Sequence, residues 1–331
     1  MPMASENSSA ADRAAAGTGP ALGDFPPTNC GTPYVWRFDS PAPGPVLMIS
    51  AAVHGNEVCG VHAIKTLLDC AITPQTGTII LALANPDAYA AHLARGGVNR
   101  YVDQDMNRLW ADDMLAQPAG DCETRRCQDL LPFLQATDFL LDLHSMTLEG
   151  PPLVLTGLMP RARQFAEQLC IGDYLIADPG HAAGRRMRDF GRFCGPNAHH
   201  TALLLECGQH QSPEAVAVAL RACLRLLGFF GHKIPEKLEK TMQEQFHLGA
   251  VKDPPVPQQV VTITDTITVR TDNYRYLGPK KALHTVTETG TLIARDGDRA
   301  ITTPYPDCIL LMPALQASPG QTAVRLGRLS R

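Results

Sequence analysis

Long apolar runs bounded by turn-forming residues predict the buried strands of this chain. The runs VLMISAAV, TIILALAN, DFLLDLH and ALLLECG occupy residues 46–53, 78–85, 138–144 and 202–208. A continuous apolar run of this length is typical of a strand that is buried on both faces. We therefore expect these four segments to form the centre of one sheet.

Between these runs, apolar residues recur at the spacing of a helix that buries one face. This pattern predicts helices over residues 57–71, 122–136, 160–170 and 213–228. Strands that alternate with helices are typical of an α/β fold in which helices cover both faces of the sheet.

The pattern changes after about residue 240. The segment VVTITDTITV is rich in β-branched residues, and the short apolar segments after it are separated by Gly, Asp and Pro. This texture predicts a small β-rich domain, with KIPEKLEKTMQEQFH as a linking helix. We therefore expect a disordered tail at residues 1–25, a catalytic domain at 26–235 and a β-rich domain at 236–331.

Composition restricts the class of partner. Lys plus Arg is 29 and Asp plus Glu is 33, so the net charge is 29 − 33 = −4, which gives no reason to expect nucleic acid or an anionic membrane. No signal peptide pattern and no membrane-spanning run is seen, and the ten cysteines contain no CxxC pair. We expect a soluble cytoplasmic protein with reduced thiols, and leave open whether it forms a homo-oligomer.

Three residues have the side chains and the positions of a metal site. His54 and Glu57 lie where a predicted strand gives way to a helix, and His144 ends another predicted strand. Two imidazoles and one carboxylate, with an open fourth position, are typical of catalytic zinc. Taken alone, an HxxE pair is more often two ordinary polar residues, so the assignment depends on the motifs around it.

Two acidic residues accompany this group. Asp142 lies two residues before His144, on the same side of the strand, and could orient a metal-bound imidazole. Glu206 ends the segment TALLLE and is placed to take a proton from a metal-bound water. A salt-bridged or capping glutamate is the alternative interpretation of Glu206.

The segment RYVDQDMNRLW brings three potential substrate-binding side chains together. Arg100 and Arg108 can bind carboxylates or an oxyanion, and the amide of Asn107 adds orientation. On their own, two arginines in a polar segment more often form a solvated surface.

The order of four motifs resembles the succinylglutamate desuccinylase/aspartoacylase family, which is related to the zinc carboxypeptidases. The motifs are HGNE at 54–57, RYVDQDMNRLW at 100–110, DLHS at 142–145 and LLLECG at 203–208, and the resemblance covers about half of the chain. DMNR stands where the family more often has DLNR. The resemblance implies a zinc-carboxypeptidase-like mixed sheet flanked by helices, followed by a smaller β-rich C-terminal domain.

The resemblance also implies the roles of the site residues. It places Zn2+ on His54, Glu57 and His144, with Glu206 as the general base and proton shuttle. It implies that Asn107 and Arg108 bind the α-carboxylate of an N-acyl amino acid, that Arg100 polarises the scissile carbonyl and that Asp142 supports a metal-bound histidine. The expected reaction is hydrolysis of the amide bond in a substrate of the succinylglutamate or acyl-aspartate type.

Several alternatives stay open. The same residues would serve a zinc carboxypeptidase that acts on short peptides or a metal-binding module without catalysis, and the C-terminal domain could serve assembly alone. The segment GHAAGRRMRDFGRF at 180–193 could line an acyl pocket, but a solvated basic loop is the favoured interpretation. Tyr274 and Tyr276 are weaker pocket candidates, and we interpret Cys59 and Cys207 as small core residues.

Overall fold

The computed structural model describes residues 19–95, 99–181, 183–195, 198–246 and 258–330. Residues 1–18 of the predicted tail therefore lie outside the described residues. In the rest of that segment, Leu22–Asp24 forms a short 3-10 helix, η1, and the ring of Phe25 stacks on that of Trp36 with centroids 5.6 Å apart. This aromatic contact holds the segment against the first strand.

The four apolar runs form the parallel centre of a large sheet, in the spatial order β3-β2-β4-β7. Their bounds are β2 Val46–Ala51, β3 Thr78–Leu83, β4 Phe139–Met146 and β7 Thr201–Gln209. All four predicted core strands are confirmed. Because the strands are parallel, their carboxyl ends meet at one edge of the sheet, where α/β proteins bind ligands.

Shorter strands make the sheet mixed. They are β1 Val35–Asp39, antiparallel to β3, then β5 Leu153–Leu155, antiparallel to β7, and β6 Tyr174–Ala177, parallel to β5. The expected mixed sheet is therefore confirmed.

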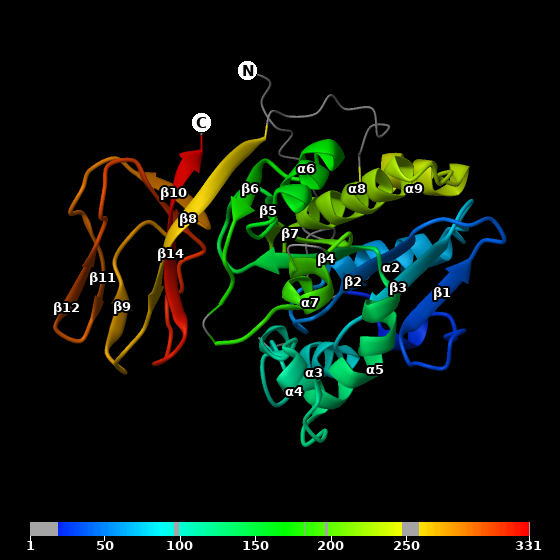
Figure 1. Ribbon diagram of the computed structural model, residues 1–331, viewed down its shortest axis with the longest axis horizontal. Helices are drawn as coiled ribbons and strands as arrows, with labels where there is room; N and C mark the ends of the chain where they lie inside the picture. Colours follow the sequence, from blue (N-terminus) through cyan, green and yellow to red (C-terminus); the bar gives the residue numbers. More distant parts are fainter. Residues whose placement is uncertain (1–18, 96–98, 182, 196–197, 247–257, 331) are drawn as a thin grey trace.

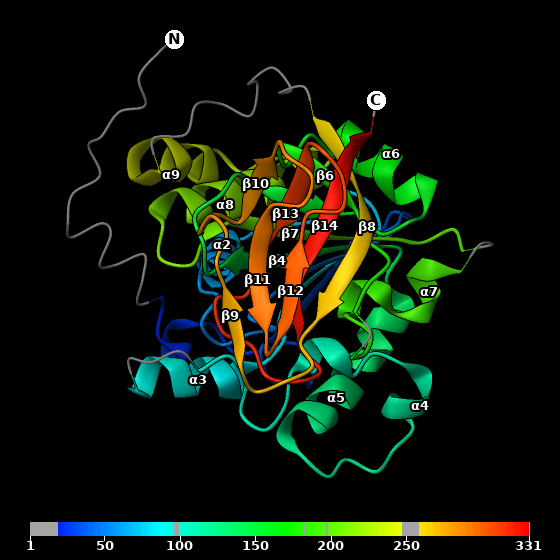
Figure 2. The same cartoon turned by 90° about the vertical axis from the view of Figure 1, so that its left-hand side faces the viewer.

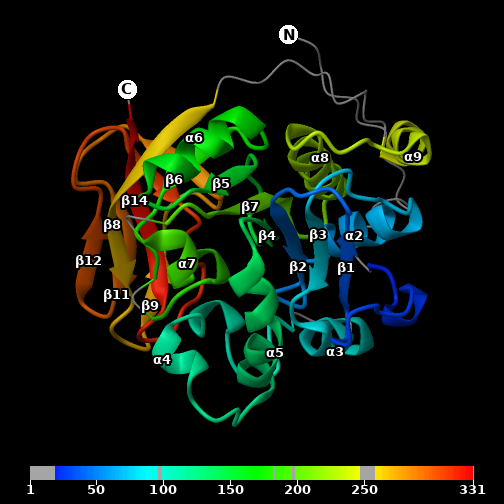
Figure 3. The ribbon, with the colours of Figure 1, turned by 45° about the vertical axis from the view of Figure 1, so that its right-hand side comes forward.

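Helices cover both faces of this sheet (Figures 1 and 3). Alternate residues of β2 point to opposite faces, so Leu47 and Ile49 pack in one core cluster and Met48 in another. The helices that contribute to the first core cluster are α2 Cys59–Asp69, α6 Pro160–Leu169, α8 Pro213–Phe229 and α9 Glu236–Phe246. The helices that contribute to the second include α5 Cys122–Ala136 and α7 Gly191–Cys194. The remaining helices are α3 Pro86–Arg95, α4 Asp112–Leu115, η2 Met106–Arg108 and η3 Met187–Asp189.

The β-rich C-terminal region continues the same sheet. Strand β8 Gln259–Thr268 pairs in parallel with β6, and the sheet then runs through β14 Thr322–Ser330, β13 Cys308–Leu311 and β10 Leu283–Val286. A second sheet of β12 Arg299–Thr302, β11 Leu292–Asp296 and β9 Tyr274–Tyr276 stacks on this part (Figure 2). Apolar side chains from both sheets fill the space between them.

Two further findings concern the chain as a whole. All ten cysteines are free thiols, and Cys59 and Cys207 are buried in the core, as predicted. Among the described residues, no helix combines the length and the apolar character needed to cross a membrane.

Candidate functional site

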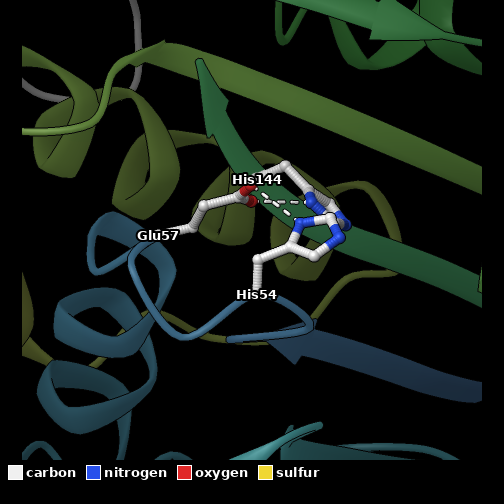
Figure 4. A group of neighbouring side chains, drawn as sticks. All are labelled: His54, Glu57 and His144. Carbon is white, nitrogen blue, oxygen red and sulfur yellow. Dashed lines mark hydrogen bonds and ion pairs between the residues drawn. The ribbon is translucent and has the colours of Figure 1, made fainter. Parts of the chain in front are cut away.

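His54, Glu57 and His144 converge at the carboxyl edge of the sheet (Figure 4). His54 and Glu57 lie in the turn between β2 and α2, and His144 lies near the end of the neighbouring strand β4. All three side chains are buried, and one potential ligand atom from each lies within 4.8 Å of the other two. The structure thus brings together the three residues that the sequence predicted as metal ligands.

The carboxylate of Glu57 lies between the two imidazoles. Its Oε1 is 2.7 Å from Nδ1 of His54, and its Oε2 is 2.7 Å from Nδ1 of His144. Burial by itself raises the pKa of Glu57, but the two imidazoles lower it more, so that it lies well below the usual value. Two imidazole nitrogens and one carboxylate oxygen are the donor set of many catalytic zinc sites, so these residues fit that ion.

The second nitrogen of each imidazole contacts another carboxylate. Nε2 of His144 is 2.8 Å from Oδ2 of Asp142, and Nε2 of His54 is 3.0 Å from Oδ1 of Asp105. A proton on each Nε2 leaves the Nδ1 lone pair free for a metal. Asp142 was predicted for this position, whereas Asp105 was not.

Asp105 is a site residue that sequence reasoning missed. Burial raises the pKa of Asp105, but His54 and the nearby Arg100 and Arg108 lower it more, so that the carboxyl stays ionised. Its only signal in the sequence is its place in the motif VDQDMNR, two residues before Asn107. No periodic pattern shows where such a loop residue points.

The three predicted substrate-binding residues lie around the same group. Nη1 of Arg100 donates to Oε1 of Glu57 at 3.2 Å, and its side chain is 40% exposed. Asn107 is buried, and its Oδ1 accepts a hydrogen bond from the backbone N–H of Met187 at 2.9 Å. Nη2 of Arg108 lies 3.4 Å from Oδ2 of Asp105. A carboxylate would therefore meet two guanidinium groups here, one of them exposed to solvent.

Glu206 lies on β7, directly beside His144 of β4 in the register of the sheet. Its Oε2 is buried and has no hydrogen-bond partner among the described residues. Burial and the nearby Glu57 raise the pKa of Glu206 to about 8, against the opposing effects of His144 and arginines 100 and 325. A carboxyl group that titrates near neutral pH is suited to accept and return a proton.

The basic segment at 180–193 is not a solvated loop throughout, so that expectation is wrong for two of its arginines. Arg186 and Arg188 are each 2% exposed. Arg186 donates to Asp178 at 2.8 Å, and Arg188 donates to the carbonyl of Thr156 at 2.8 Å. These ion pairs and hydrogen bonds offset the cost of burying guanidinium groups.

The same segment meets the C-terminal region through Arg325 of β14. Nη2 of Arg325 lies 2.6 Å from Nε2 of His181, and its Nε lies 3.3 Å from Oδ2 of Asp178. Arg325 also lowers the pKa of Glu206, which places its charge near the site. No motif pointed to this residue, because the pairing of β14 with β8 and β13 creates its position.

Tyr274 and Tyr276 lie elsewhere. Both belong to β9 of the second sheet, where their hydroxyl groups donate to the carbonyls of Ala314 and Pro279. Both side chains pack in the core between the two C-terminal sheets, and among the described residues no hydrogen bond or ion pair joins them to the residues around His54.

Solved structures of other proteins share the fold of this chain. A succinylglutamate desuccinylase from Vibrio cholerae has the same fold, with a TM-score of 0.66 and 18% identity over 90% of this chain and 86% of that chain. A succinylglutamate desuccinylase/aspartoacylase from Rhodobacter sphaeroides is also similar, with a TM-score of 0.60 and 17% identity over 87% of each chain.

The sequence comparison gives a family match over part of the chain. Residues 43–171 match the family described as the succinylglutamate desuccinylase/aspartoacylase catalytic domain, which confirms the resemblance predicted from the four motifs. An N-acyl-aromatic-L-amino acid amidohydrolase (carboxylate-forming) from Rattus norvegicus is 34% identical over 110 residues, which are 30% of this chain and 33% of the relative. The match thus spans about a third of the length of this curated relative.

Proposed function

We propose that this protein is a zinc-dependent hydrolase that cleaves the amide bond of an N-acyl amino acid. The observation that carries the proposal is the Oε2 of Glu206, which has no hydrogen-bond partner in the part of the chain that the structure describes. It lies on the strand next to His144 and to the buried group that could hold a metal ion. The matched family and the amidohydrolase relative support the same class of reaction.

His54, Glu57 and His144 would hold the zinc ion, which when bound supplies a Lewis acid that acidifies water and polarises a carbonyl. Asp105 and Asp142 orient the two imidazoles through Nε2. In this way both Nδ1 atoms stay directed at the space beside Glu57.

The remaining residues of the site bind the substrate and move protons. Arg108 and Asn107 bind the α-carboxylate, with Arg108 as the charged partner and Asn107 fixed by Met187. Arg100 stabilises the negative charge that develops on the carbonyl oxygen during attack by water. Glu206 accepts the proton of that water and delivers it to the departing amine, so the products are a carboxylate and a free amino acid.

The substitution Glu206→Gln tests this assignment. The amide keeps the shape of the side chain but cannot accept the proton, so kcat should fall by about a hundredfold or more. Zinc content, measured by elemental analysis after reconstitution, should match the wild type because Glu206 is not a proposed ligand. Near-normal turnover by this variant would refute the role of Glu206.

A substrate panel tests the reaction itself. The reconstituted protein is offered N-acetyl, N-formyl and N-succinyl amino acids beside dipeptides, with N-acyl amino acid amides as a control that lacks the α-carboxylate. We expect hydrolysis of the N-acyl amino acids and little of the amides. Faster cleavage of dipeptides would identify a carboxypeptidase, and zinc binding without any hydrolysis would identify a binding module.

A further inference from the structure

Glu123 is a fully buried acid that the proposed reaction does not use. It lies in the first turn of α5, and its side chain is inaccessible to solvent. Its Oε1 accepts hydrogen bonds from the backbone N–H of Val102 at 2.6 Å and from Nδ2 of Asn85 at 3.0 Å. Its Oε2 accepts from the backbone N–H groups of Asp103 at 3.0 Å and Gln104 at 3.2 Å. One carboxylate thus binds three successive amides of a loop.

The loop also binds the start of α5 in return. The backbone N–H of Cys122 donates to Oδ2 of Asp103 at 2.8 Å, and Nε2 of Gln104 donates to Oδ2 of Asp121 at 2.8 Å. The first N–H groups of a helix have no partner within the helix, so Asp103 supplies one that the helix itself lacks. These contacts also account for the acidic group formed by residues 103, 121 and 123. Each of its carboxylates already accepts hydrogen bonds, and the group needs no cation.

Helix α5 is in turn fixed to the sheet. Arg126, one turn after Glu123, donates to the carbonyls of Leu83 and Ala84 at 2.9 Å each, where β3 ends. Asn85, the next residue, is fully buried and donates to Glu123. Two side chains of α5 therefore link the loop to the end of β3. Glu123 binds the loop, and Arg126 binds the strand.

This loop, residues 102–104, lies between the substrate-binding residues of the proposed site. Arg100 lies just before it, and Asp105, Asn107 and Arg108 follow it directly. We infer that Glu123 is a positioning residue of the deacylation: it sets the loop so that Arg108 and Asn107 meet the substrate carboxylate and Asp105 meets His54. The inference rests on the proposed function. It assigns to Glu123 an effect on substrate binding and not only on stability.

The substitution Glu123→Gln tests the inference. The amide of the new glutamine has one oxygen acceptor and one NH2 group. At least one backbone N–H of the loop therefore loses its acceptor and faces a donor instead. We expect kcat/KM for an N-acyl amino acid to fall by about tenfold or more, mainly through KM, because the loss of alignment weakens carboxylate binding. The same substitution should cost less than about threefold in an Arg108→Ala background, where the carboxylate contact is already absent.

A merely structural role gives a different result. Glu123→Gln would then lower the unfolding temperature, while kcat/KM of the folded variant stayed within about twofold of the wild type. Alternatively, its effect on kcat/KM would add in full to that of Arg108→Ala. Either result would overturn the inference. The matched control is Asp129→Asn, which removes the same charge from an exposed position of the same helix. It should leave kcat/KM within about twofold of the wild type.

Amide hydrogen exchange separates this inference from the proposed function. In Glu123→Gln, exchange should become faster at residues 102–108 and stay unchanged in β2 and β4. If the wild type hydrolysed no N-acyl amino acid, the proposed function would fail, while the exchange measurement would still decide whether Glu123 holds the loop. Unchanged exchange at residues 102–108 would overturn the inference whatever the activity.

Discussion

At the scale of single residues, two glutamates of this protein show how hydrogen bonding decides the chemistry of a buried acid. The carboxylate of Glu123 accepts four hydrogen bonds, three of them from backbone N–H groups. The Oε2 of Glu206 accepts none from the described residues, and the pKa of this group is raised to about 8. Burial and the charge of the nearby Glu57 favour the protonated form of Glu206, and no hydrogen bond to its Oε2 from the described residues opposes them. The surroundings of Glu123 therefore suit a residue that holds the backbone in place, and those of Glu206 suit proton transfer.

The raised pKa of Glu206 predicts how the stability of the metal-free protein depends on pH. The folded state holds the proton up to about pH 8, whereas an unshifted glutamate loses it near 4.5. The free energy of unfolding contributed by this group is therefore present below pH 4.5 and is lost as the pH rises toward 8. Glu206→Gln should consequently gain stability over the wild type as the pH rises through this range, with similar stability at its acidic end.

Denaturant unfolding of both metal-free proteins across this pH range measures the difference. The control is Glu149→Gln, at an exposed acid whose pKa Lys281 lowers. Its removal should give no gain in stability at high pH. A constant difference between wild type and Glu206→Gln at every pH would contradict the shifted pKa.

At this scale, the sequence predicted residues that end apolar strands or stand in named motifs. His144 and Glu206 follow from the strand pattern, and the structure places them side by side. Glu123 and Arg325 could not be found in this way, and Asp105 was not singled out although it lies in one of these motifs. Their positions depend on contacts between segments remote in the chain, which no local periodicity records.

At the scale of elements, the turn between β2 and α2 depends on a close approach of two backbones. A Cβ on Gly55 would lie 2.2 Å from the carbonyl oxygen of Ala88 in α3 and 2.7 Å from that of Asn99. The N–H of Gly55 donates to the carbonyl of Arg100 at 2.9 Å. The glycine of HGNE therefore joins the turn of the proposed metal ligands to the segment that carries the proposed substrate-binding residues.

Gly55→Ala should separate these two segments. The methyl group meets backbone atoms that cannot rotate away, so we expect a loss of about 2 kcal/mol or more in the free energy of unfolding and a clear loss of zinc affinity. Chemical denaturation and metal titration measure the two effects. Gly120→Ala is the matched control, because apart from its chain neighbours no atom of the described residues lies within 4 Å of its Cβ position. Full zinc affinity in Gly55→Ala would show that the turn tolerates displacement.

Prediction of the elements was strongest where the apolar pattern was longest. Helix α5 spans Cys122–Ala136 as predicted, and the four core strands lie within their predicted runs or extend them by a residue or two. The short strands β5 and β6 have three and four residues, too few for a recognisable period. Pairing with longer neighbours forms them, which is a tertiary effect.

At the scale of the whole molecule, one buried carboxylate connects the loop near the site with the C-terminal region. Asp178 is 1% exposed and contacts Arg186 of the basic segment and Arg325 of β14. The main sheet itself crosses from β6 to β8 without a break. Hydrogen bonds between β6 and β8 thus join the segments before and after residue 235 in one sheet. The division into two domains near this residue remains a prediction.

Asp178→Asn should leave two buried guanidinium groups without their shared anion. We expect a loss of about 3–5 kcal/mol in the free energy of unfolding, because an unpaired buried charge is costly. Asp39→Asn is the matched control at an exposed pair with Arg37, and should cost about 1 kcal/mol or less. Equal losses in the two variants, measured by denaturant titration, would contradict a central role for Asp178.

The place of β14 in the sheet has a consequence for biosynthesis. This strand lies between β8 and β13, yet it follows every other described strand in chain order. On the ribosome, the turn of His54 and the strand of His144 emerge long before Arg325 can reach His181. A nascent chain therefore completes the segments of the proposed metal group early, and the contact between Arg325 and His181 forms only after β14 has been translated and inserted.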